Sequence, residues 1–134
     1  MDNGAGDRAI LIVEDNPDIR DTFRTLFELE GFDVHLAENG EAALHRLDDD
    51  HVEPCLILLD LAMPVMDGWK FLDVLRAREN GDRIPVAVLS ANVDPAVSRD
   101  LKSRYGVRVL RKPAPIEALL GIARTCRNGG AAAP

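Results

Sequence analysis

Hydrophobic residues form two alternating kinds of segment along the chain. Short apolar or alternating runs, typical of strands in a sheet, occupy residues 9–13, 32–36, 56–59, 85–89 and 107–110. Between these runs, apolar residues recur every three or four positions, as on the buried face of a helix, in segments that begin near residues 17, 40, 69, 95 and 116. Five alternations of strand and helix predict an α/β domain whose parallel sheet is covered by helices on both faces.

Capping residues support the predicted helices. Asn16 and Asp94 each precede a proline, and a capping side chain followed by proline in the first turn begins many helices. Gly31 and Gly106 follow helical segments, where glycine commonly ends a helix. Right-handed crossovers leave few arrangements of the strands. We therefore predict a flavodoxin-like, doubly wound, five-stranded parallel sheet, (βα)5, with strand order 2-1-3-4-5.

Length and composition indicate one globular domain. The 134 residues are 46% hydrophobic and 29% charged, which suits a single core. We expect the domain at residues 8–127, with disordered tails at 1–7 and 128–134. The sequence contains no signal-peptide pattern and no apolar run long enough to span a membrane, so we expect a cytoplasmic protein without membrane contact.

Polar residues stand where the predicted strands end. Four of the five strands lead into such residues: Glu14 and Asp15, Asp60, Ser90, and Lys112. The carboxyl ends of parallel strands meet at one edge of the sheet, where ligands of open α/β folds bind. The pattern therefore gathers three carboxylates, a hydroxyl and an ammonium group in one crevice.

Charge repulsion limits what this crevice can be. Carboxylates about 5 Å apart repel by about 3 kcal/mol per pair at an effective dielectric constant near 20. Lys112 or a hard divalent ion can offset this repulsion, and oxygen ligands suit Mg²⁺. A plain buried ion pair between Lys112 and Asp60 would leave Glu14, Asp15 and Ser90 unexplained. An aspartate beside a metal and a lysine can instead act as a nucleophile toward a phosphoryl group.

From about Arg8 to Arg127 the chain resembles the receiver domain of two-component response regulators, of the stand-alone, single-domain type. Five motifs, in order, carry the resemblance: Glu14-Asp15, Asp60, Met63-Pro64-Val65-Met66-Asp67-Gly68, Ser90-Ala91 and Lys112-Pro113. The resemblance implies that Asp60 accepts a phosphoryl group from a histidine kinase or a histidine phosphotransfer protein. Ser90 and Lys112 would assist, and water would later remove the group. The protein would then be a signalling phosphoacceptor rather than an enzyme.

The resemblance also implies a metal site. Asp15, Asp60 and the backbone carbonyl of Ala62 would bind Mg²⁺ directly, and Glu14 would act through a water molecule. Mn²⁺ could replace Mg²⁺. The Lys112-Pro113 peptide bond would be cis and would direct Lys112 into the site.

One position departs from the family pattern. The family often has an aromatic switch residue three positions before the lysine, and this chain has Val109 there. Tyr105 cannot simply replace it, because Gly106 separates Tyr105 from the strand. The chemistry is unaffected, but we expect a different readout, through the loop that contains Ala91 and through the fourth predicted helix.

The resemblance places the output surface on the fourth helix, fifth strand and fifth helix. Residues 1–90 carry 8 basic and 20 acidic side chains, whereas residues 91–134 carry 8 basic and 3 acidic ones. We therefore expect a downstream protein partner with an acidic patch. The overall charge of −7 argues against direct nucleic-acid binding, and we expect a monomer or a phosphorylation-dependent dimer.

Other functions fit the motifs less well. Phosphatases of the haloacid dehalogenase type need a second aspartate two residues after the nucleophile, where this chain has Ala62. Nucleotide-binding enzymes would have a G-x-G-x-x-G or Walker loop after the first strand, and there is none. The alternative is a phosphorylation-independent pseudo-receiver. Such modules keep the fold but usually lose the acidic pair, the aspartate or the lysine.

Overall fold

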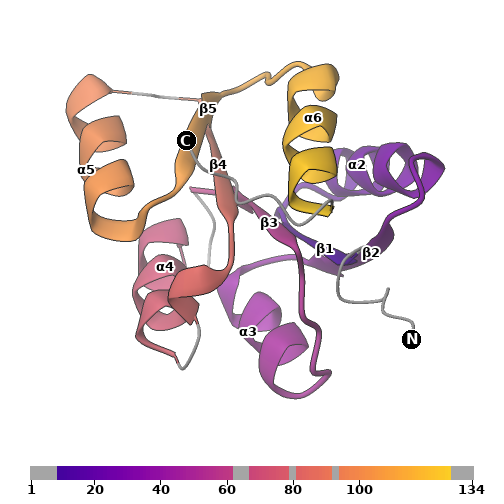
Figure 1. Ribbon diagram of the computed structural model, residues 1–134, viewed down its shortest axis with the longest axis horizontal. Coiled ribbons are helices and arrows are strands. Elements are labelled where there is room, and N and C mark those ends of the chain that lie inside the picture. Colours follow the sequence, from indigo (N-terminus) through magenta and orange to yellow (C-terminus); the bar gives the residue numbers. More distant parts are fainter. Residues whose placement is uncertain (1–8, 62–66, 79–80, 92–93, 128–134) are drawn as a thin grey trace.

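The computed structural model describes residues 9–61, 67–78, 81–91 and 94–127, and Figure 1 shows their arrangement. The strands are β1 (Ala9–Val13), β2 (Asp33–Ala37), β3 (Leu56–Asp60), β4 (Val86–Ser90) and β5 (Arg108–Arg111). The helices are α2 (Pro17–Leu29), α3 (Gly40–Asp48), α4 (Gly68–Ala77), the short 3-10 helix η1 (Gly81–Arg83), α5 (Pro95–Tyr105) and α6 (Ile116–Arg127). The fourth and fifth predicted helices are thus α5 and α6.

All strands are parallel, in the order β2-β1-β3-β4-β5, which confirms the predicted flavodoxin-like fold. The expected tails, Ala62 and residues 63–66 lie outside the described residues. Within the described part of the chain, no helix combines the length and apolar character needed to cross a membrane.

Two hydrophobic layers hold the helices on the sheet. Alternate residues of β1 and β3, such as Leu11 and Ile57, pack with α3, α4 and α5 on one face. Their neighbours Ile10 and Leu58 pack with α2 and α6 on the other face (Figure 1). Every residue of β3 is buried, as predicted for a central strand. Asp60 therefore ends a strand that is buried along its whole length.

The second strand begins one residue later than predicted, because the Phe32 N–H is taken up by a hydrogen bond that ends helix α2. Gly31 has φ 92°, and its N–H donates to the Glu28 carbonyl while the Phe32 N–H donates to the Phe27 carbonyl. This is the Schellman pattern of helix termination. The rings of Phe27 and Phe32 are 5.9 Å apart and add the accompanying hydrophobic contact. The strand can start only at Asp33.

The pair Asn80-Gly81 in the sequence predicts the end of this helix, but α4 ends earlier, at Ala77. The Arg76 side chain explains the early end, because its Nη1 donates to the carbonyls of Gly81 and Ile84 at 2.6 and 2.8 Å. These bonds hold the chain in a turn back toward β4 rather than in a longer helix.

Candidate functional site

The sheet register brings the predicted polar residues to one edge. Val13 pairs with Leu59, so Glu14, one residue further, lies next to Asp60. On the other side, the Lys112 N–H donates to the Ser90 carbonyl at 2.9 Å and extends the pairing of β5 with β4 by one residue. The carboxyl ends of β1, β3, β4 and β5 thus form one polar crevice.

Asp60, Glu14 and Lys112 make direct ionic contacts in this crevice. The Lys112 Nζ atom lies 3.2 Å from Asp60 Oδ2 and 3.5 Å from Glu14 Oε1. The side chains of Asp60 and Glu14 are only 8% and 3% exposed, and that of Lys112 is 26% exposed. A single ammonium group therefore faces two buried carboxylates, which leaves an excess of negative charge.

The pKa shifts reflect this crowding. Burial raises the pKa of Glu14, and the neighbouring Asp60 charge adds to the rise, while the Asn16 N–H and Lys112 oppose it. For Lys112, burial lowers the pKa, but the Asp60 and Glu14 carboxylates more than offset this effect, so the net shift is upward. Lys112 therefore stays cationic at neutral pH. Its favourable charge interactions are complete below its ordinary pKa and are lost as the pH rises through the higher folded-state value.

Asp15 completes a cluster of carboxylates that could hold a metal ion. One carboxylate oxygen from each of Glu14, Asp15 and Asp60 lies within 4.8 Å of the others. Asp15 is exposed, whereas the other two are buried. Three hard oxygen donors, an open side and excess negative charge are the features that Mg²⁺ or Mn²⁺ requires. The donor set therefore fits the predicted ion.

The turn after β1 holds Glu14 firmly. The Asn16 side chain caps α2 by accepting from the N–H groups of Asp18 and Ile19, and the Asn16 N–H donates to Glu14 Oε2 at 3.1 Å. Arg20, one helical turn further, donates from Nη1 to the Glu14 carbonyl at 2.9 Å. Sequence reasoning found Asn16 only as a cap and missed Arg20. The only sign of this role in the sequence is that Arg20 follows the cap residue Asn16 by one helical turn.

The loop after Asp60 depends on a glycine. The Gly68 N–H donates to the Leu61 carbonyl at 2.8 Å, which joins the start of α4 to the residue that follows β3. A Cβ atom on Gly68 would lie 2.8 Å from the Leu61 Cα and 2.9 Å from its carbonyl oxygen. Asp67 then caps α4, accepting from the Lys70 N–H at 2.9 Å. Position 68 of the sequence motif therefore favours glycine, because any larger side chain would overlap Leu61.

The remaining predicted residues lie around the crevice. Ser90 ends β4 and is half-buried, and Ala91 follows it at an exposed position. The Lys112-Pro113 peptide bond is cis. Val109 pairs with Val88 in the sheet and packs against the core on the α5 side. Ala62 lies outside the described residues, so its predicted carbonyl ligand stays a prediction.

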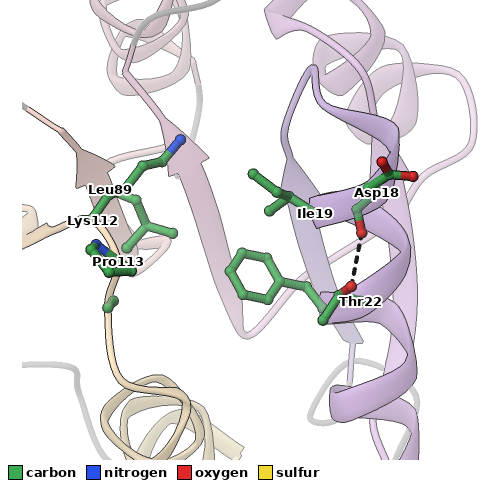
Figure 2. A pocket seen from close by; sticks show the side chains of 8 residues that line it. Asp18, Ile19, Thr22, Leu89, Lys112 and Pro113 are labelled. Carbon is green, nitrogen blue, oxygen red and sulfur yellow. Dashed lines mark hydrogen bonds between the residues drawn. The ribbon is translucent and has the colours of Figure 1, made fainter.

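A largely apolar cavity of about 510 Å³ opens beside the crevice. Figure 2 shows Asp18, Ile19 and Thr22 of α2 on one side, and Leu89, Lys112 and Pro113 on the other. The Thr22 hydroxyl donates to the Asp18 carbonyl at 2.9 Å, so it is satisfied within its helix. The cavity offers an apolar contact surface close to Asp60.

Comparisons with known proteins agree with this geometry. The family model described as "Response regulator receiver domain" matches residues 10–124. The chain is 44% identical over 82 residues to the regulatory protein AtoC of Escherichia coli, a match that covers 61% of the chain and 17% of AtoC. It is 37% identical over 100 residues to the transcriptional regulatory protein PrrA of Mycobacterium tuberculosis, covering 73% of the chain and 41% of PrrA. The chain thus spans well under half the length of these two relatives.

A solved structure shows the same fold with a metal. The receiver domain of the sensor histidine kinase PA1611 from Pseudomonas aeruginosa aligns with a TM-score of 0.75 and 30% identity, over 90% of this chain and 98% of that one. In that protein a magnesium ion is coordinated in the active site cleft.

Proposed function

The chain belongs to the response regulator receiver domain family, and from this membership we propose that it accepts a phosphoryl group on Asp60 and changes its partner binding in response. Receiver domains are signalling domains rather than classical enzymes. One observation carries the proposal: Asp60, buried at the end of β3, contacts Lys112 at 3.2 Å and shares a cluster of carboxylate oxygens with Glu14 and Asp15. We take residues 8–127 as the functional domain.

The residues suit transfer of a phosphoryl group from a phosphohistidine. An Asp60 oxygen forms a bond to phosphorus, and the electron pair of the breaking P–N bond returns to the histidine nitrogen. Lys112 neutralises charge on the phosphoryl oxygens, and the Ser90 hydroxyl donates a hydrogen bond to one of them. Later attack by water on phosphorus releases phosphate and restores the Asp60 carboxylate.

Mg²⁺ would be held by Asp15, Asp60 and the Ala62 carbonyl, with Glu14 acting through water. When bound, Mg²⁺ (or Mn²⁺) supplies positive charge that offsets the carboxylates and the transferring phosphoryl group. The fixed turn at Glu14 supports this assignment, because Asn16 and Arg20 hold the backbone from which Asp15 projects.

The partners follow from the same proposal. A histidine kinase or histidine phosphotransfer protein supplies the phosphoryl group, and the apolar cavity beside Asp60 is a suitable contact surface for it. Output passes to a downstream protein, with no direct nucleic-acid or membrane contact, through the face of α5, β5 and α6. The protein would act in the cytoplasm as a monomer or phosphorylation-dependent dimer. Arg99 and Lys102 are exposed on this face, which favours an acidic partner.

Labelling with a small donor tests the proposal. Incubation with acetyl phosphate and Mg²⁺ should add one phosphoryl group, measured by intact-protein mass spectrometry, and Asp60→Asn should abolish the addition. Asp67→Asn is the matched control, because Asp67 is an exposed cap whose function asparagine can perform. Labelling of the Asp60→Asn protein would refute the assignment. No labelling of the wild type would favour the phosphorylation-independent interaction module.

Metal affinity should separate the two residues of the acidic pair. Asp15→Asn is expected to weaken Mg²⁺ binding by about tenfold more than Glu14→Gln does, because a direct ligand contributes more than a group acting through water. Isothermal titration calorimetry measures both affinities. An equal loss, or the reverse order, would show that the direct and water-mediated ligands are misassigned.

A further inference from the structure

The C-terminal end of α5 is tied to α4 by side chains on one face of α4. Trp69, Asp73 and Arg76 follow one another at spacings of four and three residues, so they lie on the same side of the helix. Figure 1 shows α4 beside α5. Each of the three residues contacts Arg104 or Tyr105, the last two residues of α5.

Tyr105 lies at the centre of these contacts. Its side chain is buried, and its hydroxyl donates to Asp73 Oδ1 at 2.5 Å. Its ring packs edge-on against Trp69 with centroids 6.2 Å apart. Its backbone carbonyl accepts from Arg76 Nε at 2.9 Å. The Arg76 side chain thereby ties α5 to the same turn that it closes after α4.

Arg104 covers the outside of the contact. Its guanidinium carbon lies 4.9 Å from the centre of the Tyr105 ring and 5.9 Å from that of Trp69, distances at which cation–π attraction operates. It also approaches Asp73 at 3.7 Å and Asp100, on its own helix, at 3.5 Å. Arg104 is therefore a structural residue as well as part of the basic output face.

The Tyr105 hydroxyl is protonated at neutral pH, so it can donate to Asp73. Burial raises the pKa of Tyr105 to about 12, and the bond to Asp73 contributes to the rise. A raised folded-state pKa means that the protonated hydroxyl stabilises the folded protein below pH 10, and that this contribution is lost as the pH rises through about 12.

The N-terminal end of α5 is held differently. The side chain of Asp94, the N-cap residue of α5, accepts a hydrogen bond from the Ala96 N–H at 2.7 Å. Among the described residues, hydrogen bonds and ion pairs join none of residues 94–98 to another element, and Val97 packs against the core. Because α5 follows β4, this end lies at the edge of the sheet that holds Asp60 and Ser90.

We propose that Trp69, Asp73 and Arg76 form a latch for the C-terminal end of α5, so that the switching movement of this helix is a pivot about Tyr105. The pivot rests on the proposed phosphoacceptor function, whereas the latch itself does not. Position 109 holds valine and cannot supply an aromatic switch. Tyr105 instead fixes one end of the output helix, and movement at the phosphorylation edge is confined to the other end.

Amide hydrogen exchange tests both parts. In the resting protein, Tyr105→Phe and Asp73→Asn each remove the hydrogen bond while preserving side-chain shape. Exchange at residues 101–105 should become about tenfold faster in both variants, because loss of a hydrogen bond to a charged group favours local opening. Asp100→Asn is the control, because it removes the other carboxylate near Arg104 without touching Tyr105, and it should leave that exchange unchanged. Unchanged exchange in both latch variants would overturn the proposal.

Adding beryllofluoride with Mg²⁺, as a mimic of the phosphoryl group, then tests the pivot. In the wild type, the change in exchange should be confined to residues 91–99, whereas in Asp73→Asn it should spread to residues 101–105. A wild-type change that extends equally through residue 105 would refute the pivot. If the mimic changes nothing while the resting variants behave as expected, the proposed function and the pivot fail, and the latch stands as a static contact.

Discussion

Lys112→Ala is expected to lower the free energy of unfolding by about 2 kcal/mol when divalent ions are absent. The lysine faces two buried carboxylates, at 3.2 and 3.5 Å, and its removal leaves both without this cation. Loss of one partner of a fully buried ion pair costs about 3–5 kcal/mol. The expected cost is smaller because Lys112 is 26% exposed, so solvent screens part of the interaction.

Urea unfolding, with and without Mg²⁺, measures this effect. Mg²⁺ should restore part of the lost stability, because the ion offsets the same carboxylates. Lys102→Ala, on the exposed surface of α5, should change stability little and serves as the control. The Lys112→Ala protein should also fail to shift the amide NMR signals of β5 when beryllofluoride is added. Wild-type stability together with a normal shift would contradict the assigned role of Lys112.

Gly68→Ala is expected to cost about 2 kcal/mol and to slow phosphorylation by acetyl phosphate. The added methyl group would overlap the Leu61 backbone, at 2.8 and 2.9 Å, so the loop that leaves Asp60 must move. Overpacking of this kind typically costs about 1–3 kcal/mol. The effect on phosphorylation follows because Leu61 is joined directly to Asp60.

Gly121→Ala is the control, and it is expected to raise the stability that Gly68→Ala lowers. Gly121 lies within α6, and a Cβ atom there would meet nothing within 4 Å beyond its chain neighbours and the backbone of its own helix. Alanine is favoured over glycine in a helix by about 1 kcal/mol, so this variant should gain stability and phosphorylate normally. Thermal unfolding and initial phosphorylation rates measure both variants. Equal behaviour of the two would show that the close approach at Gly68 is unimportant.

The topology was predictable because short-range patterns determine it. The apolar run 56–59 is too short for a typical helix and is typical of a buried strand, and capping pairs such as Asn16-Pro17 mark where helices begin. Boundaries were less predictable, because individual hydrogen bonds that the apolar pattern does not reveal decide them. Phe32 looked like the first strand residue, but its N–H ends α2 by bonding to Phe27. The early end of α4 depends on Arg76 reaching carbonyls that follow it in a turn.

The site was predictable to a similar extent. Glu14, Asp60 and Lys112 could be brought together because parallel strands share one edge, and the structure places them in contact. Contacts that depend on tertiary packing could not be read in this way. Tyr105 and Asp73 are 32 residues apart, and no local pattern pairs them.

The central claim is that Asp60 accepts the phosphoryl group in a Mg²⁺-dependent reaction. The most direct measurement is the position of that group in the wild-type protein. After incubation with acetyl phosphate and Mg²⁺, borohydride reduction converts a phosphorylated aspartate to homoserine, which peptide mass spectrometry locates. Homoserine should appear at position 60 alone, and it should be absent when a chelator removes Mg²⁺. Homoserine at any other aspartate, or equal conversion without Mg²⁺, would contradict the claim.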